Sequence, residues 1–145
     1  MDLEFVAVSR DGREKWAPPF DEHDGFNDGW WNMTMGEAPT SSYLQVFRNG
    51  TEVARVELDD DTDISHYAGT PDLGEAGLRI VFFEVSDEHR RQGIGTAVIR
   101  HLAELHPDRR LIAFSEADDF WSKLKWLPHF HSGEGPDCQV LFIQP

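Results

Sequence analysis

The sequence has little or nothing of several features that define particular classes of protein. It contains a single cysteine, Cys138, so no disulfide can form within the chain, which agrees with a reducing compartment. No apolar run approaches the length that crosses a bilayer, and the start, Met1-Asp2-Leu3-Glu4, lacks the order of a signal peptide. We therefore expect a cytoplasmic protein with no membrane partner, folded as one domain over residues 1–145.

Basic residues are also scarce. Lys and Arg number 13 against 27 Asp and Glu, and the net charge of −14 argues against a nucleic-acid partner, which needs a basic face. Residues 1–76 carry 5 basic and 17 acidic residues, whereas residues 77–145 carry 8 and 10. The acidic first half would attract a cationic substrate, but a solvated acidic surface that keeps the protein soluble is the commoner explanation.

The first half of the chain predicts strands and loops, without internal repeats. Loose alternation predicts a strand over residues 3–8, and two alternating runs around Asn49-Gly50 predict a hairpin over residues 43–58. Residues 13–40 combine aromatic residues with Pro and Gly without a helical period, which predicts a loop with at most short helical turns. Residues 59–77 predict a connection on the surface.

The second half predicts alternating strands and helices. An apolar, β-branched run over residues 78–85 indicates a strand covered on both faces. Apolar residues at three- and four-residue steps predict a helix from Ile94 to Leu105, which Pro107 ends. The remaining predicted elements are a strand over 110–115, a short helix over 116–126 and a last strand over 139–144. This order indicates an α/β layout with a mixed sheet.

The stretch "HRRQGIGTA", residues 89–97, places cationic residues directly before Gly-Ile-Gly at the start of the predicted helix. Unpaired amides and the dipole at a helix start favour an anion there. A dinucleotide fingerprint would need Gly or Ala where Val98 stands, and its strand would run almost straight into the loop, whereas seven residues separate Val85 from Gly93. A Walker phosphate loop would need Gly-Lys-Ser or Gly-Lys-Thr, and neither tripeptide occurs.

The segment Arg90-Arg91-Gln92-Gly93-Ile94-Gly95 resembles the signature of the GNAT superfamily of acyl-CoA N-acyltransferases: Arg or Gln, two residues, Gly, one residue, then Gly or Ala. "ADDFWSKLKW", residues 117–126, is similar to the family's next helix, and the matched blocks run from Leu78 to Trp126. The resemblance implies a single α/β domain with a central mixed, mostly antiparallel, V-splayed sheet flanked by helices.

The resemblance also implies where coenzyme A binds. Amides across Arg90 to Thr96 would cradle its pyrophosphate, which glycines allow the backbone to approach, and pantetheine would enter beside Val85. The Val85 amide would hold the thioester carbonyl and stabilise the oxyanion, and Arg100 is a further candidate for charge near the phosphates. The predicted cofactor-binding residues are Phe83, Val85, Arg90, Arg91, Gln92, Gly93, Ile94, Gly95, Thr96, Ser115, Trp121 and Lys123.

Transfer to an amine requires a general base, and Glu84 is the first candidate. It is the charged side chain nearest the expected thioester site, and burial there would raise its pKa. An ion pair between Glu84 and an arginine such as Arg79 is an equally good interpretation. His89, Glu88 and His66 are weaker candidates for the base.

Two positions depart from the family pattern. Trp121 stands where the family has the tyrosine that protonates the departing thiolate, and an indole N–H cannot supply a proton at neutral pH. Lys125 stands at the family's glycine. The aromatic loop, residues 16–31, lies where the family's fold places its first two helices. We expect its large side chains either to wall the acceptor pocket or to fill the core edge: Trp16, Phe20, Trp30 and Trp31.

A metal site is not predicted. His129, His131 and Cys138 have the residue types of a zinc site, but they are loosely spaced and lack a second cluster. No basic partner identifies Cys138 as a nucleophile, and we expect it in the core.

The resemblance therefore predicts an enzyme, an N-acyltransferase that moves an acetyl or short acyl group from acetyl-CoA to a primary amine within a ternary complex. The acidic first half favours a cationic acceptor such as a polyamine, an aminoglycoside-like amine or a peptide lysine. A second copy of the chain is a further expected partner. The alternative is a non-catalytic acyl-CoA-binding or interaction module on the same fold.

Overall fold

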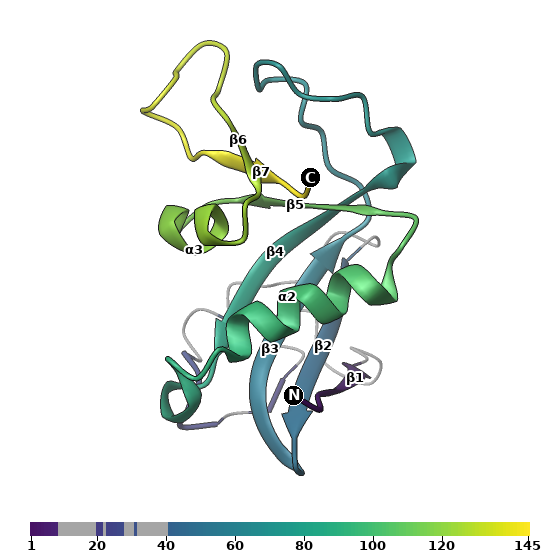
Figure 1. Cartoon of the computed structure of the whole chain (residues 1–145), viewed down its shortest axis with the longest axis vertical. Helices are drawn as coiled ribbons and strands as arrows, with labels where there is room; N and C mark the ends of the chain where they lie inside the picture. Colours follow the sequence, from purple (N-terminus) through teal and green to yellow (C-terminus); the bar gives the residue numbers. More distant parts are fainter. Residues whose placement is uncertain (9–19, 22, 28–30, 32–40) are drawn as a thin grey trace. The chain divides into compact units, whose positions relative to one another are not determined.

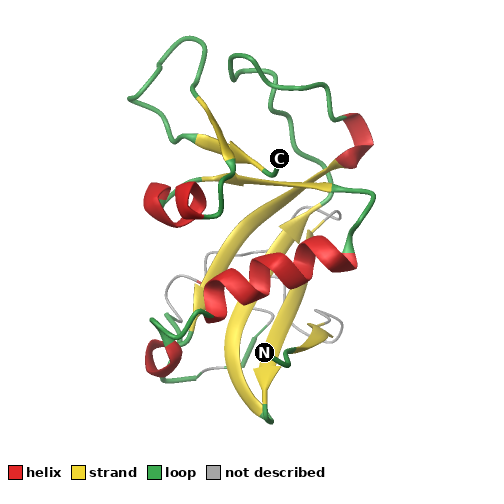
Figure 2. Cartoon of the chain, viewed as in Figure 1, coloured by secondary structure: helices red, strands yellow, loops and turns green. Residues whose placement is uncertain are grey.

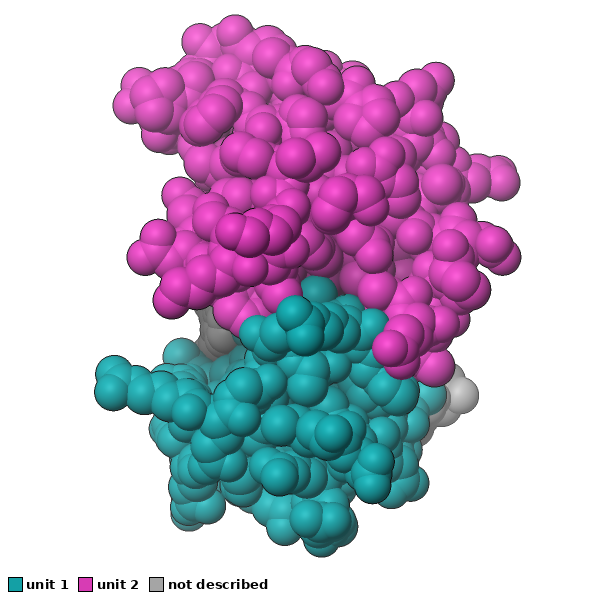
Figure 3. Space-filling view, in the orientation of Figure 1, with its two compact units in different colours: residues 1–58, 82–101 teal, residues 59–81, 102–145 magenta. Residues whose placement is uncertain are grey.

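The computed structural model describes residues 1–8, 20–21, 23–27, 31 and 41–145. The chain forms two compact units, shown in different colours in Figure 3. Unit 1 comprises Met1–Leu58 and Phe82–His101, and unit 2 comprises Asp59–Val81 and Leu102–Pro145. No helix among the described residues has the length and apolar character needed to cross a membrane.

Unit 1 is built on antiparallel strands. β1 (Glu4–Val8) pairs with β2 (Ser41–Arg48) in a register that places Phe5 opposite Val46 (Figure 1). β2 turns into β3 (Thr51–Asp59) through Asn49 and Gly50, whose φ angles of 52° and 79° lie in the left-handed region. Asn-Gly adopts this conformation at low cost, so the predicted hairpin is confirmed.

The core of unit 1 contains the described part of the aromatic loop. Phe20, Phe26, Trp31 and Tyr43 form one buried cluster, with Val8 and Phe82 packed against it. Beside this cluster the Arg55 guanidinium lies over the rings of Phe20 and Phe26, 4.8 and 4.1 Å from their centroids, and is 1% exposed. Glu52 pairs with that buried cation at 3.1 Å, so its charge is compensated.

β4 (Gly77–Val85) and α2 (Ile94–Leu105) each contribute residues to both units. β4 belongs to unit 2 up to Val81 and to unit 1 from Phe82. α2 belongs to unit 1 up to His101, whose ring stacks on Phe5 of β1 at 4.5 Å between centroids. Both elements have the bounds expected from the apolar pattern to within one residue, so these predictions are confirmed.

Unit 2 continues from the beginning of β4 with strand order β4-β5-β7-β6. β5 (Arg110–Phe114) runs parallel to β4, and the paired residues extend from Gly77–Arg110 to Arg79–Ile112. β7 (Leu141–Ile143) is antiparallel to β5 and to β6 (Leu127–His129). The last strand is shorter than predicted, and β6 was not predicted because three residues that include a proline show no alternation.

The connection over residues 59–77 is drawn mostly as loop in Figure 2 and includes η1 (Gly74–Ala76). The expectation that it lies on the surface is only partly right. Tyr67 is buried in one cluster with Ile112, Leu141 and Ile143, and its hydroxyl donates to the Gln139 carbonyl at 2.8 Å. The connection therefore supplies part of the core of unit 2.

α3 (Asp118–Lys123) is shorter than the predicted helix and has a defined end. Lys125 has a φ of 66°, its amide donates to the Ser122 carbonyl at 3.0 Å, and the Trp126 amide donates to the Trp121 carbonyl at 3.3 Å. The Trp121 and Trp126 rings contact each other, with centroids 4.7 Å apart. These are the features of a Schellman motif, in which glycine is the usual left-handed residue.

Candidate functional site

The candidate site is the connection from β4 to α2 in unit 1. It begins with η2 (Asp87–His89), which was not predicted. The Ser86 amide donates to the Val53 carbonyl of β3 at 2.8 Å, and the Asp87 amide donates to the Gly25 carbonyl at 2.9 Å. These bonds fix the start of the connection to the strands of unit 1.

We call residues Arg90 to Gly93 the basic loop. Arg90 is extended, with φ −69° and ψ 155°, and is followed by left-handed Arg91 with a φ of 63°, a combination close to that of a type II turn; Gly93 is also left-handed, with a φ of 77°. All four residues are exposed, whereas Ile94, at the start of α2, is 1% exposed and anchors the helix in the core. Successive amides in such a conformation form a concave site that suits an anion.

The start of α2 adds further donors to the basic loop. The Ala97 amide donates to the Gly93 carbonyl at 3.1 Å, which makes this the first helical hydrogen bond of α2. The amides of Ile94, Gly95 and Thr96 therefore have no acceptor within the helix. Twelve residues of aligned peptide dipoles direct a partial positive charge to the same end.

The two arginines of the basic loop have different surroundings. The Arg90 side chain turns back: its Nε donates to the Val85 carbonyl at 3.1 Å, and its Nη2 lies 3.0 Å from Asp87 Oδ1 and 3.4 Å from Glu84 Oε2. Arg91 is exposed, and the described residues include no ion-pair partner for it. Arg91 is thus a cation of the loop whose charge no ion pair among the described residues compensates, whereas Arg90 is paired although its side chain is 54% exposed.

Glu84 lies at the end of β4 and is 6% exposed. Its carboxylate accepts hydrogen bonds from the Asn27 amide at 3.0 and 3.1 Å and from Trp31 Nε1 at 2.8 Å, besides the contact with Arg90. The expected arginine partner, Arg79, is not used: its guanidinium lies over the Phe114 ring in unit 2, 4.7 Å from the centroid. The strand-end carboxylate does pair with an arginine, as in the ion-pair interpretation, and that arginine is Arg90 rather than the example Arg79, because the turn after Val85 brings Arg90 back to the strand end.

The other predicted cofactor residues fall into two groups. Phe83, Val85 and Thr96 are half-buried in unit 1 beside the basic loop. Those in unit 2 are Ser115, Trp121 and Lys123. Ser115 accepts a hydrogen bond from the Ala117 amide at 3.0 Å, Trp121 is 6% exposed against Phe120 and Trp126, and Lys123 is exposed. Their part in binding coenzyme A stays a prediction.

The aromatic residues expected near an acceptor are placed in the core where the structure describes them. Phe20 is 2% and Trp31 1% exposed, and their rings meet edge to face with centroids 4.8 Å apart. This favours the alternative in which they fill the core edge. Trp16 and Trp30 lie outside the described residues.

The minor base candidates differ in exposure. Glu88 and His66 are exposed, and His66 lies 3.9 Å from Asp63, whereas His89 is half-buried with an unpaired Nδ1. No contact in the described residues distinguishes one of them as a base. Their roles stay predictions, as does that of Arg100, which is exposed on α2.

The histidines of unit 2 make ordinary loop contacts. His131 Nδ1 accepts hydrogen bonds from the Gly133 and Glu134 amides at 3.1 and 3.0 Å, and His129 Nδ1 lies 3.2 Å from the Ala68 carbonyl. The part of the chain that the structure describes contains no group of three His, Cys, Asp or Glu residues that could hold a metal ion.

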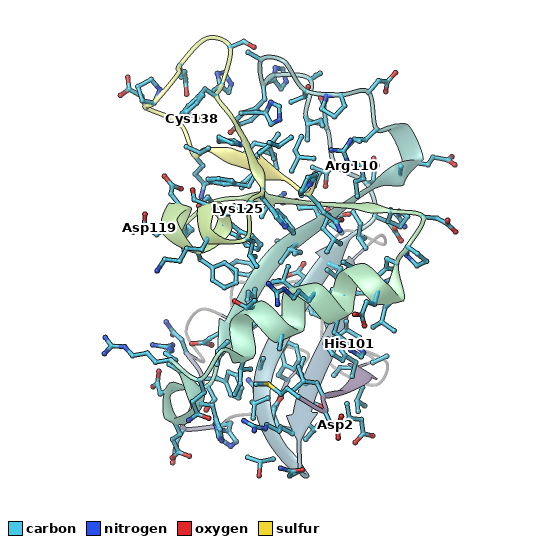
Figure 4. All side chains as sticks on the ribbon, in the orientation of Figure 1. Asp2, His101, Arg110, Asp119, Lys125 and Cys138 are labelled. Atoms are coloured by element: carbon cyan, nitrogen blue, oxygen red, sulfur yellow. The ribbon has the colours of Figure 1, made fainter. Side chains whose placement is uncertain are left out.

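Cys138 is half-buried rather than in the core, contrary to expectation (Figure 4). Its Sγ lies 3.9 Å from the Tyr67 hydroxyl. Burial raises the pKa of Tyr67 above its ordinary value, and the contact with Cys138 raises it further. Cys138 lies in a loop beside the buried Tyr67. The presence of a single cysteine in the sequence does not indicate such a position.

The family assignment rests on a match that covers most of the chain. A model of the GNAT acetyltransferase family matches residues 5–122, and the chain therefore belongs to that family. The match includes β1, the hairpin, the basic loop and most of α3, and it confirms the resemblance inferred from the loop motif. No curated protein matches the chain in sequence.

Solved structures agree on the fold. An acetyltransferase from Thermus thermophilus is 14% identical, with a TM-score of 0.56 over 78% of this chain and 69% of that one. The ribosomal-protein-S18-alanine N-acetyltransferase from Escherichia coli is 14% identical, with a TM-score of 0.52 over 98% and 91%. A mutant of the toxin AtaT, bound to the C-terminus of the antitoxin AtaR and acetyl-CoA, is 13% identical, with a TM-score of 0.60 over 100% and 94%. The expected mixed, mostly antiparallel fold is confirmed.

Proposed function

We propose that the protein transfers an acetyl or short acyl group from acetyl-CoA to a primary amine, and that the basic loop holds the diphosphate of coenzyme A. The observation that carries this proposal is the loop itself. Left-handed Arg91 and Gly93 expose backbone amides at the start of a twelve-residue helix, beside a cation that is not paired internally among the described residues. A diphosphate fits such a site through amide hydrogen bonds, the helix dipole and the charge of Arg91.

The chemistry requires few groups from the protein. The amine nitrogen forms a bond to the acyl carbon, the bond between that carbon and sulfur breaks, and the amine loses one proton to a base or to water. The Val85 amide is our candidate donor to the thioester oxygen, where negative charge develops. Because Trp121 cannot donate a proton at neutral pH, we propose that sulfur leaves as a thiolate or is protonated by solvent.

The charge of the chain favours a cationic acceptor. Residues 1–76 carry 17 acidic and 5 basic residues, an imbalance that attracts polyamines, aminoglycoside-like amines or a peptide lysine rather than a polyanion. One structural neighbour is named for acetylating an alanine of a ribosomal protein, so peptide amines belong in the acceptor panel. A second copy of the chain is a further proposed partner.

Calorimetry with acetyl-CoA and matched glycine variants tests the binding site. Gly93 and Gly69 have φ angles of 77° and 70°, and nothing lies within 4 Å of a Cβ placed on either one. Alanine therefore introduces the same backbone strain, about 1–2 kcal/mol, at both positions. We expect Gly93→Ala to weaken binding about tenfold, because the basic loop must take up this strain to bind the diphosphate. A strain of about 1.4 kcal/mol corresponds to a factor of ten in affinity. Gly69→Ala should leave the affinity unchanged, and equal effects would contradict the site.

The second candidate function is a binding module without turnover, which the tryptophan at position 121 favours. Thiol release from acetyl-CoA across a panel of amines separates the two. Sustained release with one amine supports the enzyme. Saturable binding of acetyl-CoA without release on any amine supports the module.

A further inference from the structure

Glu84 is held by donors that come from two different segments. The Asn27 amide and the Trp31 indole approach from the aromatic loop, at 3.0 and 2.8 Å, and the Arg90 guanidinium approaches from the basic loop, at 3.4 Å. With 6% exposure the carboxylate has little access to solvent. Its lone pairs are directed at groups of the protein, whereas a proton acceptor needs a lone pair that faces the amine.

The two donors from the aromatic loop belong to residues that contact each other. The Trp31 amide donates to the Asn27 carbonyl at 3.1 Å, so the two residues are also bonded to each other. The Asn27 amide and the Trp31 indole both donate to the same carboxylate. Removing the carboxylate would leave the buried Trp31 indole N–H and the part-buried Asn27 amide without this acceptor, and the loss is costly at the buried indole.

The same segment contacts the strand end at two further points. The Gly25 carbonyl accepts from the Asp87 amide at 2.9 Å, and a Cβ at Gly25 would lie 2.5 Å from Ser86 Oγ. Any residue with a Cβ at this position would displace the Ser86 hydroxyl or the backbone. The backbone of residues 25–27 is thus fitted against residues 84–87 independently of the carboxylate.

Arg90 extends the arrangement to the Val85 peptide group. Its Nε donates to the Val85 carbonyl at 3.1 Å, while its Nη2 contacts Glu84 and Asp87 at 3.4 and 3.0 Å. Although the Arg90 side chain is 54% exposed, its planar guanidinium contacts two carboxylates and the Val85 carbonyl at once. It therefore links the peptide that follows Val85 to Glu84 and Asp87.

We propose that Glu84 is a positioning residue and not the proton acceptor: its carboxylate fixes Asn27 and Trp31 against the end of β4 and, through Arg90, fixes the main chain at Val85. The proposal deepens the proposed function and rests on it. A fixed end of β4 matters for catalysis because it lies beside the Val85 amide, which we assign to the thioester carbonyl. Arg91, and not Arg90, is left to contact the diphosphate.

The test combines a structural and a kinetic measurement. Hydrogen exchange at the Asn27 amide and the Trp31 indole, followed by NMR, reports the anchor without any substrate. Glu84→Ala should accelerate both exchanges about tenfold or more, the equivalent of one lost hydrogen bond to a charged group. Glu84→Gln retains one oxygen acceptor for both donors and should change them less. Glu104→Gln, at an exposed position on α2, is the matched control and should change neither.

The kinetic arm uses thiol release as a function of pH. A general base raises the rate about 100- to 10,000-fold. If Glu84 were the base, Glu84→Gln would remove that factor and also the acidic limb of the profile, which is the fall in rate at low pH as the base becomes protonated. We expect a loss below about tenfold with the limb retained, and a comparable loss in Trp31→Phe, which keeps the carboxylate but removes the indole donor.

The outcomes are separable from those of the proposed function. Loss of the acidic limb in Glu84→Gln, with unchanged exchange in Glu84→Ala, would overturn the positioning role while the acyltransferase assignment stands. Exchange that accelerates as expected supports the anchor even if the wild-type protein releases no thiol, a result that would count against the proposed function alone.

Discussion

The end of α3 gives a quantitative prediction about Lys125 (Figure 4), which occupies a position where glycine is usual. Its φ of 66° costs a residue with a Cβ about 1–2 kcal/mol. Glycine removes that cost but loses about 0.5–1 kcal/mol more through the freedom of the unfolded chain. We expect Lys125→Gly to raise the free energy of unfolding by about 0.5–1 kcal/mol.

The assay is urea denaturation followed by tryptophan fluorescence, since the rings of Trp121 and Trp126, 4.7 Å apart, lie directly at this helix end. Lys125→Ala is the control, because alanine removes the exposed side chain and keeps the backbone strain. It should leave stability close to that of the wild type. Equal stabilisation by the two variants would show that side-chain removal, and not backbone conformation, causes the effect. Destabilisation by Lys125→Gly would contradict a backbone strain at Lys125.

Two further predictions concern close contact and pH. Gly25→Ala should destabilise unit 1 by about 1–3 kcal/mol, the usual cost of overpacking. Ser86→Ala removes the buried Oγ that lies 2.5 Å from the added Cβ, and the double variant should recover most of the loss in urea denaturation; no recovery would contradict the contact. Burial, and then Arg109, lower the pKa of His106 below its ordinary 6.5, so the unfolded chain binds the proton first. Stability should therefore fall as pH drops through about 6.5, more in the wild type than in His106→Gln, and identical pH profiles would exclude this cause.

The elements that local sequence determines were predicted well. The hairpin follows from Asn49-Gly50, because both left-handed conformations are encoded by two adjacent residues. α2 follows from its apolar spacing and from Pro107, and its bounds, Ile94–Leu105, are those predicted. The basic loop and the family were also evident from adjacent residues.

The elements that depend on distant partners were not predicted. β6 is three residues long and exists because it pairs with β7, so no pattern within it indicates a strand. For Trp31, filling the core edge was one of two alternatives that the sequence left open, because the residue lies in a stretch without periodicity and its burial depends on Phe20, Tyr43 and Phe82. Contacts between residues far apart in the chain leave no local pattern in the sequence.

The candidate site was predicted in its residue content but not in its internal contacts. Arg90 and Arg91 are adjacent and chemically identical, and only the left-handed conformation at Arg91 sends the two side chains to different surroundings. A left-handed arginine is uncommon, so sequence gives no sign of it. For the same reason Glu84 could not be assigned to Arg90 before the turn between them was known.

The most direct test of a diphosphate site at the basic loop is isothermal titration of acetyl-CoA into the wild type, Arg91→Ala and Arg48→Ala. Arg91 faces no internal partner among the described residues, whereas Arg48 lies at the end of β2, and its replacement removes the same charge from unit 1. We expect saturable binding to the wild type, a loss of about tenfold or more in Arg91→Ala, as for a hydrogen bond to a charged group, and unchanged affinity in Arg48→Ala. No measurable binding to the wild-type protein, or equal losses in the two variants, would contradict a diphosphate site at the basic loop.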